Sequence, residues 1–281
     1  MRVRFSNGII TAEADTHGAE LVSVAVGGRE RLWQNQSGEW SGHAPVLFPV
    51  CGKCSVLLNG REYEVGRHGF ARNSEFTLVE ERKNAVSFQL RSSAETKLRY
   101  PFDFIFRVRY LLIGARLKIV YEIENPSAGV LYFSCGAHES FALERPVGEH
   151  ELLFSRKENF SSLLHDENGC LNGEAVSFGE GTRLALDEDF LSEGRTIIFK
   201  GLRSRRVVLC ERGGNAVAKI KFSGFPNLLL WRAGQAPFLC IEPWHNLPDD
   251  GKSVAFPNRE GVIALHAHQK KKFTREIEYL Y

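Results

Sequence analysis

The 281-residue sequence lacks any long apolar run, and no stretch approaches the roughly 20 apolar residues that a helix needs to cross a bilayer. Its first residues, Met1 to Phe5, lead into an alternating pattern without the apolar segment of a signal peptide. Strong net charge is also missing, because 36 basic and 34 acidic side chains leave a formal charge of +2. No overall field would attract nucleic acid or an anionic membrane. We therefore expect a cytoplasmic protein that binds neither.

Cysteine is sparse, and most of the six residues, at positions 51, 54, 135, 170, 210 and 240, stand inside apolar runs. Such positions favour buried, reduced thiols over a disulfide framework. Cys51 and Cys54 have the C-x-x-C spacing of metal sites and redox pairs, but no second motif completes a tetrahedral ligand set. We expect no metal. The one basic run, Lys270 to Lys272, is typical of a solvated strand edge or turn.

Helical periodicity is missing too, apart from one turn near residues 95–100. Short alternating segments separated by Gly, Asn and Pro predict strands instead, and Asn59-Gly60 is a strong hairpin signal. Residues 152–186 look irregular with scattered strands, and residues 186–191 look like an acidic loop. No internal repeat or linker divides the chain. The sequence therefore predicts one all-β domain over residues 1–281, a large antiparallel β-sandwich.

An acid follows the most apolar of these predicted strands. Phe238 to Ile241 form a short buried run, and Glu242 comes next. Pro243 is expected to end the strand or to sit at its edge because it cannot donate to a ladder. A carboxylate is costly to bury alone. Glu242 therefore either faces a cleft that uses it or turns into solvent at the strand end. Trp244 beside it is a flat surface of the kind that lines pockets for rings.

Two further loops carry histidine, His68 and His138, although most loop histidines are surface or packing residues and the spacing does not show that these two meet. An apolar segment broken by two prolines leads to Lys53. Arg72 follows the first histidine loop, where it is either a binding residue or a partner in a local ion pair.

Three stretches resemble signature segments of the aldose 1-epimerase (galactose mutarotase) family, in particular its short bacterial branch: His68-Gly-Phe-Ala-Arg72, Gly136-Ala-His138 and Phe238-Leu-Cys-Ile-Glu242-Pro-Trp244. Supporting stretches follow in the family's order over about residues 8–281: Gly18 to Leu21, Leu32-Trp33, Ala44 to Pro49, Tyr100 to Phe104 and Gly224 to Pro226. The resemblance implies a galactose mutarotase-like supersandwich. It also implies interconversion of the α and β anomers of a free hexose such as galactose or glucose.

The resemblance gives roles to these residues. Glu242 would be the base that takes the proton of the C1 hydroxyl, and His138 the acid that protonates the ring oxygen. His68 would hydrogen-bond the sugar. A carboxylate and an imidazole suit this exchange near neutral pH, because modest shifts of their pKa values tune each of them. The reaction proceeds slowly in water, so it requires no metal or organic cofactor.

Other positions would bind the sugar by the same resemblance, namely Lys53, Arg72, Trp244 and an acid from the middle of the chain, for which Asp187 is the first candidate and Asp189 the alternative. Lys53 stands where the family has an arginine, which keeps the charge but loses the bidentate fork. Glu139 stands where the short branch has proline. Close to His138 it would raise the pKa of that imidazole; otherwise it would point into solvent.

Three functions remain open at this point. The first is a mutarotase for a free hexose, and the second is one for a hexose phosphate, with Lys53, Arg67 and Arg72 available as basic groups. The third is a carbohydrate-binding or regulatory protein that kept the fold without turnover. The expected partner is a small sugar, Trp244 and Phe70 are its candidate aromatic contacts, and the protein is a monomer or a homodimer.

Overall fold

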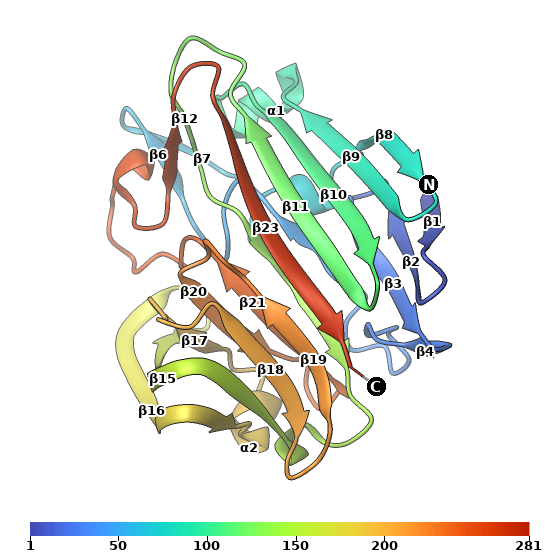
Figure 1. Ribbon diagram of the computed structural model, residues 1–281. Coiled ribbons are helices and arrows are strands. Elements are labelled where there is room, and N and C mark those ends of the chain that lie inside the picture. Colours follow the sequence, from blue (N-terminus) through green and yellow to red (C-terminus); the bar gives the residue numbers. More distant parts are fainter. Residues whose placement is uncertain (281) are drawn as a thin grey trace.

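Strands dominate the computed structural model, which describes residues 1–280 (Figure 1). A four-stranded sheet of order β1-β2-β3-β4 comes first: β1 (Arg2–Ser6), β2 (Ile10–Asp15), β3 (Leu21–Val26) and β4 (Arg29–Glu30). Two short pairs stand apart, β6 (Val56–Leu58) with β7 (Arg61–Tyr63), and β12 (Leu131–Phe133) with β22 (Ile263–Leu265). Asn59 and Gly60 both have positive φ and form the turn of the predicted β6–β7 hairpin.

The main sheet has 15 strands and runs β5-β13-β21-β20-β17-β15-β18-β19-β23-β11-β10-β9-β8, with β14 beside β21 and β16 beside β15. Its strands are β5 (Val46–Leu47), β8 (Thr77–Arg82), β9 (Ala85–Arg91), β10 (Ile105–Ile113), β11 (Arg116–Glu124), β13 (Gly136–Ala137), β14 (Glu139–Ala142), β15 (His150–His165), β16 (Leu171–Ala185), β17 (Ile197–Phe199), β18 (Arg206–Glu211), β19 (Ala216–Lys221), β20 (Asn227–Trp231), β21 (Phe238–Trp244) and β23 (Lys270–Tyr279). The helices are short: α1 (Ala94–Arg99), α2 (Glu188–Ser192) and the 3-10 turns Ala71–Asn73, Val147–Glu149 and Phe256–Asn258.

The two halves of the main sheet pack against one large apolar core. β15 links its two halves, because residues 150–154 pair with β18 whereas residues 162–163 pair with β17. Alternate residues of both halves meet in one apolar cluster, among them Val108 and Tyr110 of β10, Leu228 of β20, and Leu239 and Ile241 of β21. The predicted all-β antiparallel sandwich is confirmed, and burial of these alternating faces is what holds its layers together.

Two segments differ from their predictions. Residues 152–186, predicted to be irregular, form most of the long β15–β16 hairpin. Their alternation is hidden because β16 is largely exposed and the pairing contains three register shifts, so few apolar side chains mark the strands. Residues 186–191, predicted to be a loop, contain most of α2. Asp187 is the N-cap of this helix, and its carboxylate accepts a hydrogen bond from the Phe190 N–H at 2.9 Å.

Strand β21 continues through Pro243 to Trp244, so the first of the two predictions for Pro243, that it ends the strand, was wrong, and Pro243 is the last residue but one. All seven residues of β21 are buried, with β20 on one side and β13 and β14 on the other. Alternation places Leu239 and Ile241 in the main core. Cys240, Glu242 and Trp244 therefore point to the opposite face of the sheet.

Glu139 on β14 follows neither of its two predicted placements. Its side chain is 3% exposed, so it does not point into solvent, and alternation puts it on the sheet face opposite His138. One carboxylate oxygen, Oε2, lies 2.5 Å from Nη1 of Arg275 on β23, which is 1% exposed and also donates from Nη2 to the Tyr121 hydroxyl at 3.0 Å. This buried ion pair joins β14, the strand beside β21, to β23 in the middle of the sheet.

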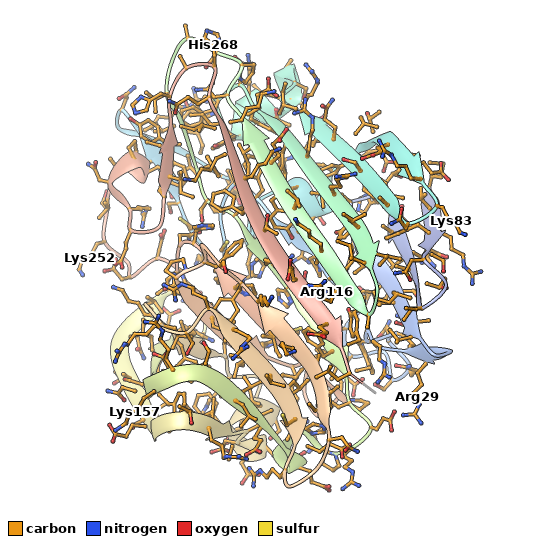
Figure 2. The ribbon with its side chains drawn as sticks, viewed as in Figure 1. Arg29, Lys83, Arg116, Lys157, Lys252 and His268 are labelled. Atoms are coloured by element: carbon orange, nitrogen blue, oxygen red, sulfur yellow. The ribbon has the colours of Figure 1, made fainter. Side chains whose placement is uncertain are left out.

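Basic side chains are spread over the surface, as the labelled Arg29, Lys83 and Lys157 show (Figure 2). Lys270 and Lys272 lie at the start of β23, where they form ion pairs of 3.1 and 2.9 Å with Glu124 and Glu122 on the neighbouring strand. Among residues 1–280, no helix is both long and apolar enough to span a membrane.

Replacing Glu139 by Gln should lower the free energy of unfolding by about 3–5 kcal/mol, because Arg275 would keep its charge in the core without a counterion. Urea denaturation measures the change. Glu144→Gln is the matched control: it removes an ion pair with Arg29 in which both side chains are about two-thirds exposed, and it should cost about 0–1 kcal/mol. Equal effects of the two substitutions would contradict the structural role of the buried pair.

Candidate active site

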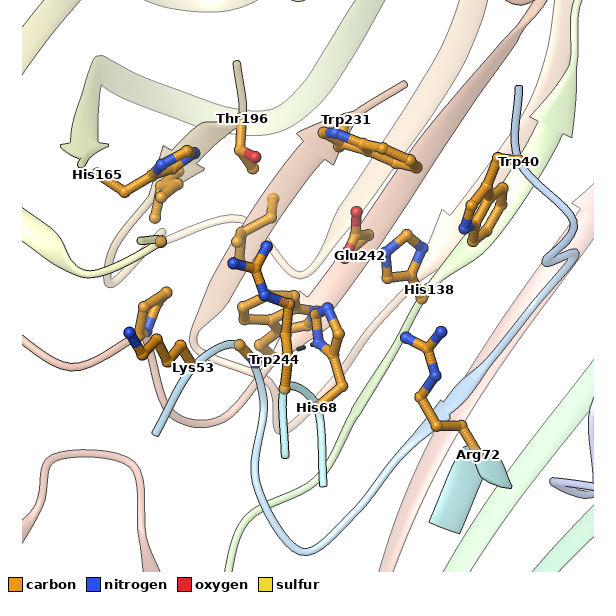
Figure 3. Close-up of a pocket in the computed structure, with 16 residues that line it drawn as sticks. Trp40, Lys53, His68, Arg72, His138, His165, Thr196, Trp231, Glu242 and Trp244 are labelled. Carbon is orange, nitrogen blue, oxygen red and sulfur yellow. Dashed lines mark hydrogen bonds and ion pairs between the residues drawn. The ribbon is translucent and has the colours of Figure 1, made fainter. Parts of the chain in front are cut away.

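A cavity of about 270 Å³ lies over the face of β21 that points away from the main core (Figure 3). Strands form its floor and loops form its walls. The lining residues are Trp40, Gly52, Lys53, Arg67, His68, Arg72, His138, His165, Gly169, Thr196, Ile198, Leu229, Trp231, Glu242, Trp244 and Pro248. Six of the seven predicted site residues are thus brought together, although the sequence places them in four separate segments.

His138 and Glu242 are cross-strand neighbours. β13 pairs Gly136 with Trp244 and β14 pairs Glu139 with Ile241, which is one continuous register that sets His138 opposite Glu242. The break between β13 and β14 falls beside Pro243, which has no N–H to donate. Opposed residues hold their Cβ atoms about 4.5–5.5 Å apart. Here Nε2 of His138 lies 3.4 Å from Oε2 of Glu242.

Burial controls the charge of this pair, since His138 is 6% and Glu242 2% exposed. Burial lowers the pKa of His138 to about 3, and the nearby Arg72 charge acts in the same direction. Burial also raises the pKa of Glu242 well above its usual range, with a further contribution from the Glu139 charge. Both groups therefore favour their neutral forms, so the titratable proton of the pair favours Glu242.

His68 is held in place by backbone geometry. Its own φ is 68°, and that of Gly69 is 74°. A Cβ at position 69 would meet the Phe48 carbonyl oxygen at 2.2 Å, so only glycine allows this loop to pack here. The Gly52 N–H donates to Nδ1 of His68 at 3.1 Å, which leaves the proton on Nε2. Burial, followed by the charges of His138, Arg72 and Arg67, lowers the pKa of His68 well below its usual range.

Three basic side chains, Lys53, Arg67 and Arg72, also line the cavity. Lys53 is exposed at the cavity edge, Arg72 is half-buried, and Arg67 donates from Nη2 to the Asn168 carbonyl at 3.3 Å (Figure 3). Within the described residues that line the cavity, Glu242 supplies the only carboxylate. The cavity therefore carries an excess of positive charge.

Indole rings form much of the remaining wall. Trp244 donates from Nε1 to the Ala137 carbonyl at 3.2 Å, and its ring meets that of His68 edge-on with centroids 5.2 Å apart. Trp40 and Trp231 lie 5.1 and 5.6 Å from the His138 ring. Neither of these two tryptophans was among the predicted site residues. A tryptophan in a loop rich in Gly and Ser was an available signal for Trp40, whereas Trp231 has the pattern of an ordinary strand residue.

Comparison with known proteins identifies the family of this chain. The sequence model of the family "Aldose 1-epimerase" matches residues 1–266. The chain belongs to this family. Protein LacX of Lactococcus lactis is 32% identical over 265 residues, or 88% of each chain. A galactose mutarotase-like protein from Lactobacillus casei superimposes with a TM-score of 0.92, 26% identity and full coverage of both chains. A galactose mutarotase related enzyme from Lactobacillus acidophilus gives 0.91 at 25% identity, covering all of this chain and 98% of the other.

Asp187, the predicted sugar-binding acid of this aldose 1-epimerase family member, does not belong to the cavity. It is exposed, and its carboxylate caps the N-terminus of α2. Asp189 in the first turn of the same helix is exposed as well and lines no part of the cavity. Phe70 is likewise removed from the site, because it packs in the main core against the rings of Phe48 and Tyr100.

His68 should be neutral at pH 6, with its proton on Nε2, because burial disfavours the imidazolium and the Gly52 N–H occupies Nδ1. Long-range ¹H–¹⁵N NMR distinguishes the two nitrogens. Since unfolding restores a pKa of about 6.5, the unfolded chain binds this proton more readily, and the His68 contribution makes stability fall as the pH drops below that value. His68→Gln should remove this part of the pH dependence. Two protonated nitrogens at pH 6 would contradict the assignment.

Proposed function

We propose that this protein is an aldose 1-epimerase that interconverts the α and β anomers of a hexose. The observation that carries the proposal is the buried pair of Glu242 and His138, with 3.4 Å between Oε2 and Nε2, inside a cavity lined by indole rings. Anomerisation moves one proton from the C1 hydroxyl and delivers one to the ring oxygen. Those two oxygens are bonded to the same carbon, so a base and an acid that lie side by side match them.

In the proposed reaction Glu242 takes the proton of the C1 hydroxyl while His138 protonates the ring oxygen. The C1–ring oxygen bond breaks and leaves an open-chain aldehyde. After the C1 carbonyl turns over, the C5 hydroxyl attacks its other face, and the two side chains return their protons in the reverse sense. Each group is regenerated, so the cycle balances without a cofactor.

The assignment requires the shared proton on His138, whereas the sugar-free site keeps it on Glu242. Sugar hydroxyls that donate to a carboxylate stabilise its charged form and lower its pKa. Binding of the sugar would therefore move the proton from Oε2 to Nε2 over the distance between these atoms. The neutral His68, with its Nε2–H, would donate to a sugar oxygen beside them.

Replacing either member of the pair should abolish the acceleration of mutarotation. General acid–base help of this kind contributes about 10²–10⁴-fold per group, so Glu242→Gln and His138→Asn should each lose at least about a hundredfold in kcat/KM. Polarimetry of freshly dissolved α-D-galactose and α-D-glucose measures the rate.

Asp187→Ala is the matched control for this measurement. The substitution removes the cap of α2 and should cost about 0.5–2 kcal/mol of stability while leaving the rate of mutarotation unchanged. If the unmodified protein accelerates neither sugar nor a hexose 6-phosphate, the proposal fails, and binding without turnover becomes the better reading.

A hexose phosphate is the second candidate substrate, and the surplus of positive charge in the cavity favours it. Lys53, Arg67 and Arg72 all line the cavity, and the one lining carboxylate among the described residues is Glu242. Arginine and lysine are the usual ligands of phosphate groups. A neutral hexose would leave these charges without a counterpart.

Lys53→Met tests the second candidate, because it keeps a chain of similar length and removes the exposed charge. With glucose 6-phosphate as substrate, KM should rise about tenfold or more, as expected when a charge-assisted contact worth about 1.5–3 kcal/mol is lost. With glucose itself KM should stay the same. Equal KM changes for both sugars would exclude a phosphate contact at this residue.

A further inference from the structure

Cys240 is a buried nucleophilic side chain that the proposed reaction does not use. It lies on β21 two residues before Glu242, so both side chains point to the same face of the sheet. On that face Cys240 packs with Trp33 and Phe238, and Trp231 stands opposite it on β20. Its thiol therefore lies beside the acid–base pair.

We propose that Cys240, His138 and Glu242 together bind a thiophilic divalent cation such as Zn²⁺, which occupies the site in place of the sugar. One donor atom from each side chain lies within 4.8 Å of the other two, and all three residues are buried. Imidazole nitrogen, thiolate sulfur and carboxylate oxygen are the three donor types that zinc takes in proteins.

The spacing of the pair supports this inference. The 3.4 Å between Nε2 and Oε2 is longer than a good hydrogen bond of roughly 2.7–3.2 Å. It matches the edge of a tetrahedron around zinc, which is about 3.4 Å for metal–nitrogen and metal–oxygen bonds of about 2.0–2.2 Å. The Cys240 sulfur, which lies within 4.8 Å of both atoms, would occupy the third corner. The fourth position opens toward the cavity that His138 and Glu242 line.

Charge neutrality is the second argument. A neutral imidazole, one thiolate and one carboxylate balance the charge of a divalent cation, so the bound site carries no net charge into the apolar surroundings. The nearby Arg72 acts against the cation. We therefore expect weaker binding than at a dedicated structural zinc site. Because the ion engages both Nε2 and Oε2, it would exclude the sugar and stop the acid–base exchange.

Binding is tested with Co²⁺ as the probe on protein that has first been treated with a chelator. Coordination by Cys240 should give a thiolate-to-cobalt absorption band that Zn²⁺ displaces. Cys240→Ser should lose the band and weaken Zn²⁺ binding by about 10–100-fold or more. Cys210→Ser, the same substitution on β18 at a cysteine outside the cavity, should keep both. If Cys240→Ser does not fold, as shown by circular dichroism, Cys240→Ala replaces it.

Inhibition is tested separately, because it rests on the proposed function. Zn²⁺ should slow mutarotation competitively with the sugar, and Cys240→Ser should retain activity while losing this sensitivity. A wild-type protein without the cobalt band, or a band that persists without Cys240, would overturn the metal site. A protein that binds cobalt through Cys240 but shows no mutarotation would leave the metal site standing and overturn the proposed function alone.

Discussion

The pairing of β14 with β21 is the constraint on which the site depends. One uninterrupted register sets His138 opposite Glu242, and the sheet geometry brings Nε2 to 3.4 Å from Oε2. A shift of β21 by one residue would turn Glu242 to the other face, into the main core. Leu239 and Ile241, which bury their side chains in that core, oppose such a shift. Packing of β21 on one face therefore fixes the position of Glu242 on the other.

Burial then determines the electrostatic character of the pair. A carboxylate and an imidazole removed from water both favour their neutral forms, which lowers the pKa of His138 and raises that of Glu242. The two groups with opposite shifts hold one titratable proton between them, and hydrogen bonds donated to the carboxylate would lower its pKa and move that proton to the imidazole. Burial also bears on the proposed metal site of His138, Cys240 and Glu242. A divalent cation there would balance the negative charges of the thiolate and the carboxylate.

An ion pair between Glu139 and Arg275 supports this arrangement from the opposite face of the sheet. Glu139 follows His138 directly, but its carboxylate points to the opposite face and meets the guanidinium of β23. The ion pair joins segments 136 residues apart and anchors β14 next to β21. A proline at this position could not form this contact. The position itself lies outside the cavity.

The sequence by itself determined the fold class, the family and most of the candidate site, because alternation of apolar residues and short ordered motifs are local signals. Lys53, His68, Arg72, His138, Glu242 and Trp244 were all chosen from such signals, and all line the cavity. Local signals did not predict that the Asp187 carboxylate caps a helix. They also did not predict β16, because its side chains are largely exposed and bulges interrupt its alternation.

Only the tertiary structure decided which residues meet. Trp40 and Trp231 reach His138 from a loop and from a separate strand, and nothing in the sequence around Trp231 marks it as a site residue. Glu139 adopts neither of its two predicted placements, close to His138 or in solvent, because its partner, Arg275, lies far along the chain. Burial depends on such distant contacts, and the pKa values of His138 and Glu242 depend on burial. Both therefore follow from how the strands are paired and packed.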